Sequence, residues 1–123
     1  MDVRSFEDLE CYQQTREFRR ELSQLARGLP KRETYLLADQ LLRASRSVTA
    51  NIAEGYGRHH HQENLQFCRQ ARGSLTECLD HLGVALDEGY LESGRYERLR
   101  VHYETCLKLL NGYIRYIRNC GGK

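Results

Sequence analysis

Two lines of polar residues at helical spacing are the first candidates for chemistry in this 123-residue chain. One line is Gln40, Arg43, Ser47, Asn51 and Glu54, and the other is Gln70, Ser74, Glu77 and His81. Steps of three and four place each line on one face of a helix. We call the two lines together the polar seam, because an antiparallel helix pair would bring them face to face. We interpret it as a network that fixes helix register rather than as a ligand site.

The pairing across the polar seam follows from residue numbers, because level positions in an antiparallel hairpin have a constant sum. This rule predicts three pairs: Arg43 with Glu77, Ser47 with Ser74, and Asn51 with Gln70. Gly73 and the serines would let the two backbones approach closely.

Residues suited to catalysis do not form a recognisable site. Di-iron sites in helical bundles typically use Glu-x-x-His, and no glutamate here is followed three residues later by histidine. Glu77 and His81 stand four apart, but two ligands do not make a catalytic metal site. No phosphate-cradling glycine loop or nucleophile motif occurs. We therefore predict that the protein is not an enzyme, with no catalytic residues and no cofactor.

The run His59-His60-His61 could bind Zn²⁺ or Ni²⁺, especially if an assembly brought several copies together. The alternative is a solvated loop of mostly neutral imidazoles. We favour the solvated loop and predict no metal site.

The cysteines do not form a recognisable pattern. Five are present (Cys11, Cys68, Cys78, Cys106 and Cys120), an odd number without a Cys-x-x-Cys pair, so neither a disulfide framework nor a zinc knuckle is expected. No run of 18 apolar residues and no secretory signal is visible, so we expect a soluble, cytoplasmic protein without membrane contact.

Positive charge is carried by 16 arginines and only 3 lysines, with a net charge of +2. Eight basic residues lie away from the apolar faces of the first and last predicted helices: Arg16, Arg19, Arg20, Arg27, Arg98, Lys108, Arg115 and Arg118. They predict nucleic-acid binding, which would depend on salt. Against this, the pI is only about 8.3 and Glu17 and Glu21 interrupt the arginines. The alternative is a structural or adaptor protein that binds a protein partner without nucleic acid.

Apolar residues recur at steps of three and four along four segments, which predicts helices over residues 6–28, 31–55, 62–88 and 94–119. The inward-facing stripes are Cys11, Thr15, Phe18, Leu22, Leu25 and Leu29; Leu37, Leu41, Ala44, Val48 and Ile52; Cys68, Ala71, Leu75, Leu79, Leu82 and Leu86; and Tyr96, Leu99, Tyr103, Cys106, Leu110, Tyr113 and Ile117. Similar lengths and short loops predict one domain, 1–123, that is all-α: an antiparallel up-and-down four-helix bundle. Leu9 and Tyr12 lie off the first stripe, so we expect them in an exposed protein contact.

The segment from Gln40 to Arg58, with Asn51-Ile52-Ala53-Glu54-Gly55 inside it, resembles the signature of the bacterial four-helix bundle protein family, also called the 23S rRNA intervening-sequence protein family. Three further segments are similar to that family: Ala71 to Glu77, Phe6-Glu7-Asp8-Leu9 and Gly89-Tyr90-Leu91.

The resemblance implies a ring-shaped homopentamer of bundles without established enzymatic activity, some of them encoded inside insertions of 23S rRNA genes. A similar branch, the accessory variability determinants of diversity-generating retroelements, binds nucleic acid and a reverse transcriptase. Relatives often carry lysines and serines where this chain has His59-His60-His61. This difference weakens the expectation that nucleic acid binds at that loop.

Overall fold

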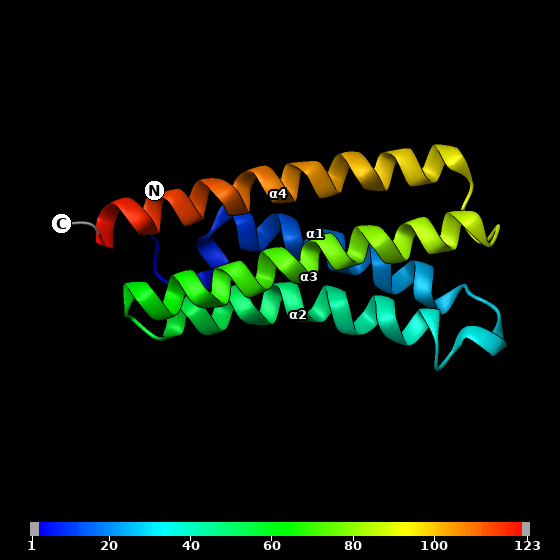
Figure 1. Ribbon diagram of the computed structural model, residues 1–123, viewed down its shortest axis with the longest axis horizontal. Coiled ribbons are helices and arrows are strands. Elements are labelled where there is room, and N and C mark those ends of the chain that lie inside the picture. The colour runs from blue at the N-terminus through cyan, green and yellow to red at the C-terminus, as the bar shows by residue number, and fades with distance from the viewer. Residues whose placement is uncertain (1–2, 122–123) are drawn as a thin grey trace.

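Four long helices form the protein in a computed structural model that describes residues 3–121 (Figure 1). They are α1 (Glu10–Arg27), α2 (Leu37–Gly57), α3 (His61–Asp87) and α4 (Ser93–Gly121), and two short 3-10 helices, η1 (Phe6–Asp8) and η2 (Lys31–Glu33), precede α1 and α2. The colours in Figure 1 run in opposite directions along successive helices. The chain is therefore an all-α four-helix bundle, as the periodicity predicts; the outermost residues of the expected 1–123 domain lie outside the described range.

The core forms where the four apolar stripes meet. Its largest fully buried side chains include Phe18, Leu22, Leu41, Ile52, Leu75, Leu82 and Leu110. Five of the predicted stripe residues are only half-buried, at the edges of the core: Leu29, Leu79, Leu86, Tyr96 and Tyr113. Burial of leucine and isoleucine side chains contributes about 1.5–3 kcal/mol each, which makes this core the main source of stability.

Two predicted helix starts differ from the structure. The first segment is split at Leu9, whose backbone is extended (φ −72°, ψ 129°), because a capping box between Ser5 and Asp8 closes η1 as a separate turn. The second segment begins its α-helix at Leu37 rather than at residue 31, after η2 and a turn. At both helix starts, side chains therefore point in directions other than those that one continuous helix would give them.

Of the two glycines, Gly55 and not Gly73 lies close against the facing helix. A Cβ on Gly55 would lie 2.6 Å from Asn64 Oδ1 and 2.9 Å from Phe67 Cβ, whereas a Cβ on Gly73 would meet no atom within 4 Å. Gly55 is buried inside α2, which continues to Gly57. Its role is therefore helix packing, and the helix extends two residues beyond the predicted end at residue 55.

The polar seam forms only in part. Ser47 Oγ lies 2.8 Å from Ser74 Oγ, which is the predicted contact. Asn51 Nδ2 instead donates to Ser47, to its carbonyl oxygen at 2.8 Å and its Oγ at 3.1 Å, so the predicted pair with Gln70 is wrong. Gln70 and Gln40 are exposed, and exposed Glu54 pairs with Arg58 at 2.8 Å.

The predicted pair of Arg43 with Glu77 is also wrong. The Arg43 side chain is 81% exposed and pairs with Asp39 at 2.9 Å, one turn earlier on the same helix. Glu77 Oε2 accepts from His81 Nε2 at 3.0 Å, one turn later on the same helix. Local pairs at four-residue spacing keep both charges in water, whereas a pair buried between the helices would have to be desolvated.

No helix within residues 3–121 combines the length and apolarity needed to cross a membrane.

Four buried thiols predict a loss of stability in alkali. Burial raises the pKa of Cys11, Cys78 and Cys106 from 9.0 to about 12, and that of Cys68 to about 11. Above pH 9 the unfolded chain releases these protons while the folded chain retains them, so the free energy of unfolding falls as the pH rises from 9 towards 12. We expect a loss of about 1 kcal/mol per thiol between pH 7.5 and 10.

Urea unfolding at the two pH values in the presence of a reductant measures this loss. Cys78→Ala should show a smaller difference between pH 7.5 and 10 than the parent protein, whatever its own stability at pH 7.5. Equal differences in the two proteins would contradict burial of a neutral Cys78 thiol.

Candidate nucleic-acid interface

The eight predicted basic residues do not form one patch. Arg19 and Arg20 on α1 lie against α2, whereas Lys108 and Arg115 on α4 lie against the other side of α1. Arg16, Arg27, Arg98 and Arg118 are exposed. The structure thus places four of the eight residues in two separate grooves, which differ in the charges that line them.

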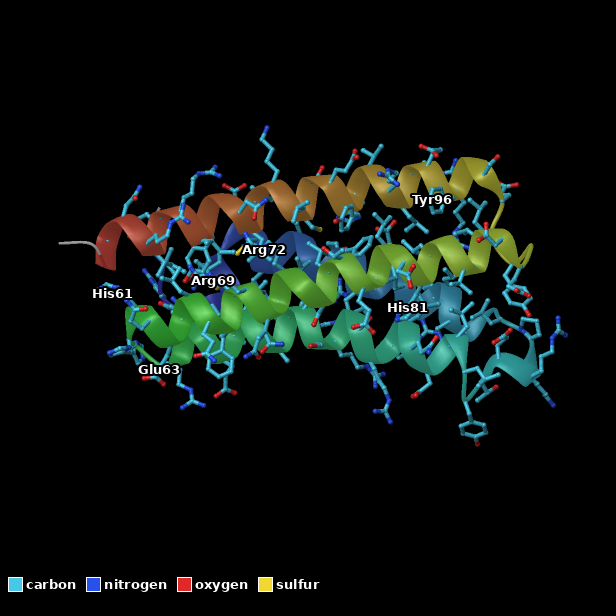
Figure 2. The ribbon with its side chains drawn as sticks, in the orientation of Figure 1. His61, Glu63, Arg69, Arg72, His81 and Tyr96 are labelled. Atoms are coloured by element: carbon cyan, nitrogen blue, oxygen red, sulfur yellow. The ribbon has the colours of Figure 1, made fainter. Side chains whose placement is uncertain are left out.

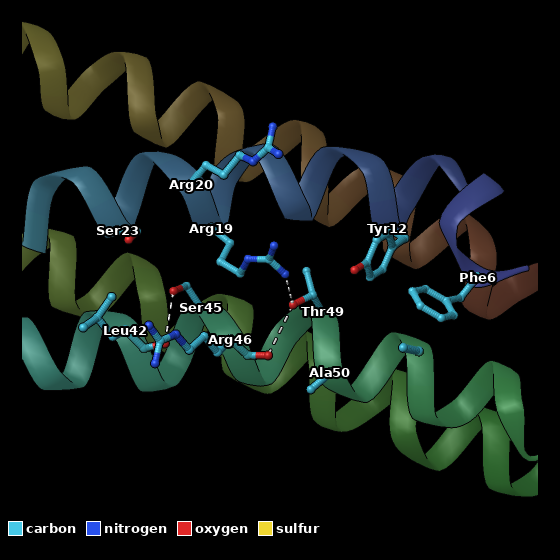
Figure 3. A pocket seen from close by; sticks show the side chains of 11 residues that line it. Phe6, Tyr12, Arg19, Arg20, Ser23, Leu42, Ser45, Arg46, Thr49 and Ala50 are labelled. Atoms are coloured by element: carbon cyan, nitrogen blue, oxygen red, sulfur yellow. Dashed lines mark hydrogen bonds between the residues drawn. The ribbon is translucent and has the colours of Figure 1, made fainter.

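The groove between α1 and α2 has a volume of about 570 Å³ and is referred to here as the α1–α2 groove. Its lining is Phe6, Tyr12, Arg19, Arg20, Ser23, Leu42, Ser45, Arg46, Thr49, Ala50 and Ala53. Figure 3 shows Arg19 reaching from α1 toward Thr49 of α2, whereas the Arg46 side chain lies along α2 beside Leu42. Arg46 is a site residue that the sequence prediction missed.

One hydroxyl group on α2, that of Thr49, holds Arg19 in place. The Arg19 guanidinium donates to Thr49 Oγ1 at 2.9 Å, and Thr49 is buried (4% exposed) and donates in turn to the Arg46 carbonyl at 3.3 Å (Figure 3). Ser45, also buried, donates to the Leu42 carbonyl at 3.3 Å. The groove floor is therefore ordered before any ligand arrives, which lowers the entropic cost of binding.

The α1–α2 groove is positively charged because no aspartate or glutamate lines it. Within residues 3–121, no carboxylate forms an ion pair with Arg19 or Arg46, and Arg20 pairs with exposed Glu17 at 3.1 Å. Three guanidinium groups around one groove repel one another, so an anion bound between them would be stabilised. Arginine forks match phosphate oxygens particularly well.

Glu21 stands among these arginines in the sequence, but in the structure its side chain is turned toward α4. Its carboxylate bonds to His102 Nδ1, and His102 Nε2 lies 3.1 Å from Gln14 Oε1. The contact ties α1 to α4 on the side of α1 that faces away from α2. Glu21 is therefore not among the residues that line the α1–α2 groove.

An aromatic pair closes one end of the α1–α2 groove. The Phe6 and Tyr12 rings are edge to face, with centroids 4.8 Å apart and planes at 71°. The expectation that Leu9 and Tyr12 form an exposed contact is wrong: Leu9 is buried (9% exposed) and Tyr12 is half-buried. The backbone at Leu9 is extended, and its side chain belongs to the hydrophobic core and lines the same groove as Leu109 and Tyr113 of α4.

The second groove, between α1 and α4, is less suited to an anion. Its volume is about 530 Å³, and Asp8 and Glu10 line it together with Lys108 and Arg115. The mixture of signs weakens its attraction for phosphate.

The histidine segment forms a hollow of about 500 Å³ where α2 meets α3, lined by Tyr56, His59, His60, His61, Asn64 and Tyr113. His59 has a positive φ of 54°, and His60 Nδ1 lies 3.7 Å from Glu63 Oε2. Figure 2 places His61 at this end of the bundle and His81 far along α3 toward the other end. Within residues 3–121, no three His, Cys, Asp or Glu side chains are grouped so that they could hold a metal ion.

Comparison with known proteins identifies the family. Residues 7–112 match the family model described as 23S rRNA-intervening sequence protein. The comparison with curated proteins returned no match. The matched range includes α1, α2 and α3 in full, most of α4, and every residue of the α1–α2 groove except Phe6. The chain belongs to the 23S rRNA-intervening sequence protein family.

Proposed function

We propose that this protein is a non-enzymatic bundle that binds nucleic acid, and that the α1–α2 groove is where the phosphate backbone lies. The observation that carries the proposal is the presence of Arg19, Arg20 and Arg46 around one groove that no carboxylate lines. Arginines supply the charge and the paired donors that phosphate oxygens require.

The positive surface continues beyond the α1–α2 groove. Arg27 and Lys31 line a smaller hollow of about 290 Å³ that shares Leu42 with that groove. From Tyr12 to Arg27 the helix rises about 22 Å, at about 1.5 Å per residue. A surface of this length supports contact with several successive phosphates of one strand.

Binding through phosphates makes a specific prediction about salt. If three arginines neutralise three phosphates, the slope of log K against log salt should be about −2 for a single strand. Affinity for a fluorescein-labelled 20-nucleotide RNA or DNA should then fall about 15-fold between 50 and 200 mM KCl. Fluorescence anisotropy measures this fall. Absence of binding at 50 mM KCl, or an affinity that does not change with the KCl concentration, would count against the proposal.

Self-association or a protein contact is the second candidate function. Tyr35 and Leu36, in the turn before α2, are 89% and 61% exposed. Exposed apolar residues of this size at one end of a bundle favour a protein contact. We propose a homo-oligomer, with the pentamer that the family resemblance implies as the expected size.

Light scattering measures the mass in solution. A monomer at micromolar concentration would contradict self-association, and an unchanged oligomer in Leu36→Asp would exclude Leu36 from its contact surface.

A cytoplasmic location is part of the proposal. The cysteines Cys11, Cys68, Cys78, Cys106 and Cys120 are all free thiols. Free thiols persist in reducing compartments, where disulfides are rare.

A further inference from the structure

The aromatic end of the α1–α2 groove carries a selectivity that phosphate contacts alone do not provide. We infer that the groove takes single-stranded nucleic acid, with a nucleobase packed against Phe6 and Tyr12 and the adjoining phosphate held by Arg19 and Arg46. This inference rests on the proposed function and narrows its ligand class.

The arrangement of the lining supports a base at this position. Phe6 and Tyr12 are half-buried and lie at one end of the groove, beside the guanidinium of Arg19 (Figure 3). At the same end α2 contributes small side chains, Ala50 and Ala53, which leave room beside the rings. Aromatic faces stack on any nucleobase, so such a site tolerates different sequences.

The Phe6 ring is held in place before binding. Asp8 and Ser5 cap η1, and Gln13 Nε2 donates to the Glu7 carbonyl at 3.1 Å, which ties η1 to α1. The edge-to-face contact with Tyr12 restricts the ring further. A base therefore meets a rigid surface, and little ordering of the protein opposes its binding.

A duplex cannot use this surface. The groove of about 570 Å³ is of the size that holds a small ligand, and the bases of a duplex are paired and stacked inside it. A duplex would offer only its phosphates to the arginines. A single strand offers both phosphates and unstacked bases, and one stacked base strengthens binding about tenfold.

The test compares three labelled probes of equal length on the unaltered protein at one salt concentration: a single strand, the same strand with abasic sites, and its duplex. The abasic strand keeps the phosphates and removes the bases. We expect the base-bearing strand to bind about tenfold more tightly than the abasic strand, and more tightly than the duplex. Because the protein is unaltered, loss of folding cannot produce this result.

A matched pair of variants locates the effect. Phe6→Leu keeps an apolar side chain but removes the ring, and it should reduce single-strand affinity about tenfold while leaving abasic-strand affinity and the salt slope unchanged. Tyr116→Leu removes an exposed ring (63% exposed) from α4, outside the groove, and should change neither affinity. Thermal unfolding checks that both variants are folded.

The outcomes separate the two proposals. Salt-dependent binding with equal affinity for abasic and base-bearing strands would overturn the inference and leave the proposed function standing. The same holds if the duplex binds at least as tightly as the single strand. Absence of binding to all three probes would overturn both.

Discussion

Replacing Gly55 with alanine is expected to lower the free energy of unfolding by about 3 kcal/mol, at the upper end of the range for overpacked sites. The added Cβ would stand 2.6 Å from Asn64 Oδ1, 2.9 Å from Phe67 Cβ and 3.2 Å from the Asn64 carbonyl oxygen. The amide of Asn64 can rotate, but the other two atoms belong to or adjoin the backbone of α3. The two helices would therefore have to separate at this end of α2, about two turns from the Ser47–Ser74 contact.

Gly57→Ala is the matched control, two residues further along α2. Its Cβ would meet no atom within 4 Å, and alanine has the higher helix propensity. We expect its stability to be unchanged or higher by up to about 1 kcal/mol. Urea unfolding followed by circular dichroism compares the two variants. If Gly55→Ala proved as stable as Gly57→Ala, the close α2–α3 packing described here would be wrong.

The double substitution Arg19→Gln with Arg46→Gln is expected to weaken nucleic-acid binding about 60-fold at 50 mM KCl. Each phosphate contact to a single strand contributes a salt slope of about −0.7, which amounts to about eightfold in affinity between 1 M and 50 mM salt. Two lost contacts multiply to about 60-fold. Glutamine keeps a donor for Thr49 Oγ1, so the fold should be retained.

Arg43→Gln is the matched control for this prediction. Arg43 lies on the same helix as Arg46 but outside the α1–α2 groove, with its side chain 81% exposed. Its replacement removes one positive charge, half of what the double variant loses, so an effect of net charge alone would appear in this protein as well. Anisotropy titrations should show affinity within about twofold of the parent protein for Arg43→Gln, because exposed charges away from the contact are largely screened.

The fold was predictable because the apolar spacing repeats over many residues. The residues of the stripe from Leu37 to Ile52 are all buried, as the 3.6-residue period of a helix predicts. Helix starts were less predictable, because Ser5 begins a capping box whether a short turn or a long helix follows. The extended backbone at Leu9 depends on packing against α4, which no local pattern encodes.

The candidate site was less predictable than the fold. Arg19 and Arg20 were identified from their place opposite the apolar stripe, but Arg46 was not. The line through Arg43 and Ser47 predicts that the polar side of α2 faces α3, and this prediction leaves out Arg46. Arg46 and Thr49 stand three apart on another face, and this spacing is the signal that could have found them. Whether that face meets α1 depends on how the helices rotate when they pack.

The claim that the α1–α2 groove binds phosphates is tested most directly by the salt slope of the parent protein and of the Arg19→Gln, Arg46→Gln double variant. Anisotropy titrations with one labelled single strand at several KCl concentrations give both slopes. The account predicts a slope of about −2 for the parent and a slope shallower by about 1.4 for the double variant. Equal slopes in the two proteins would show that phosphates are bound elsewhere and would contradict the account.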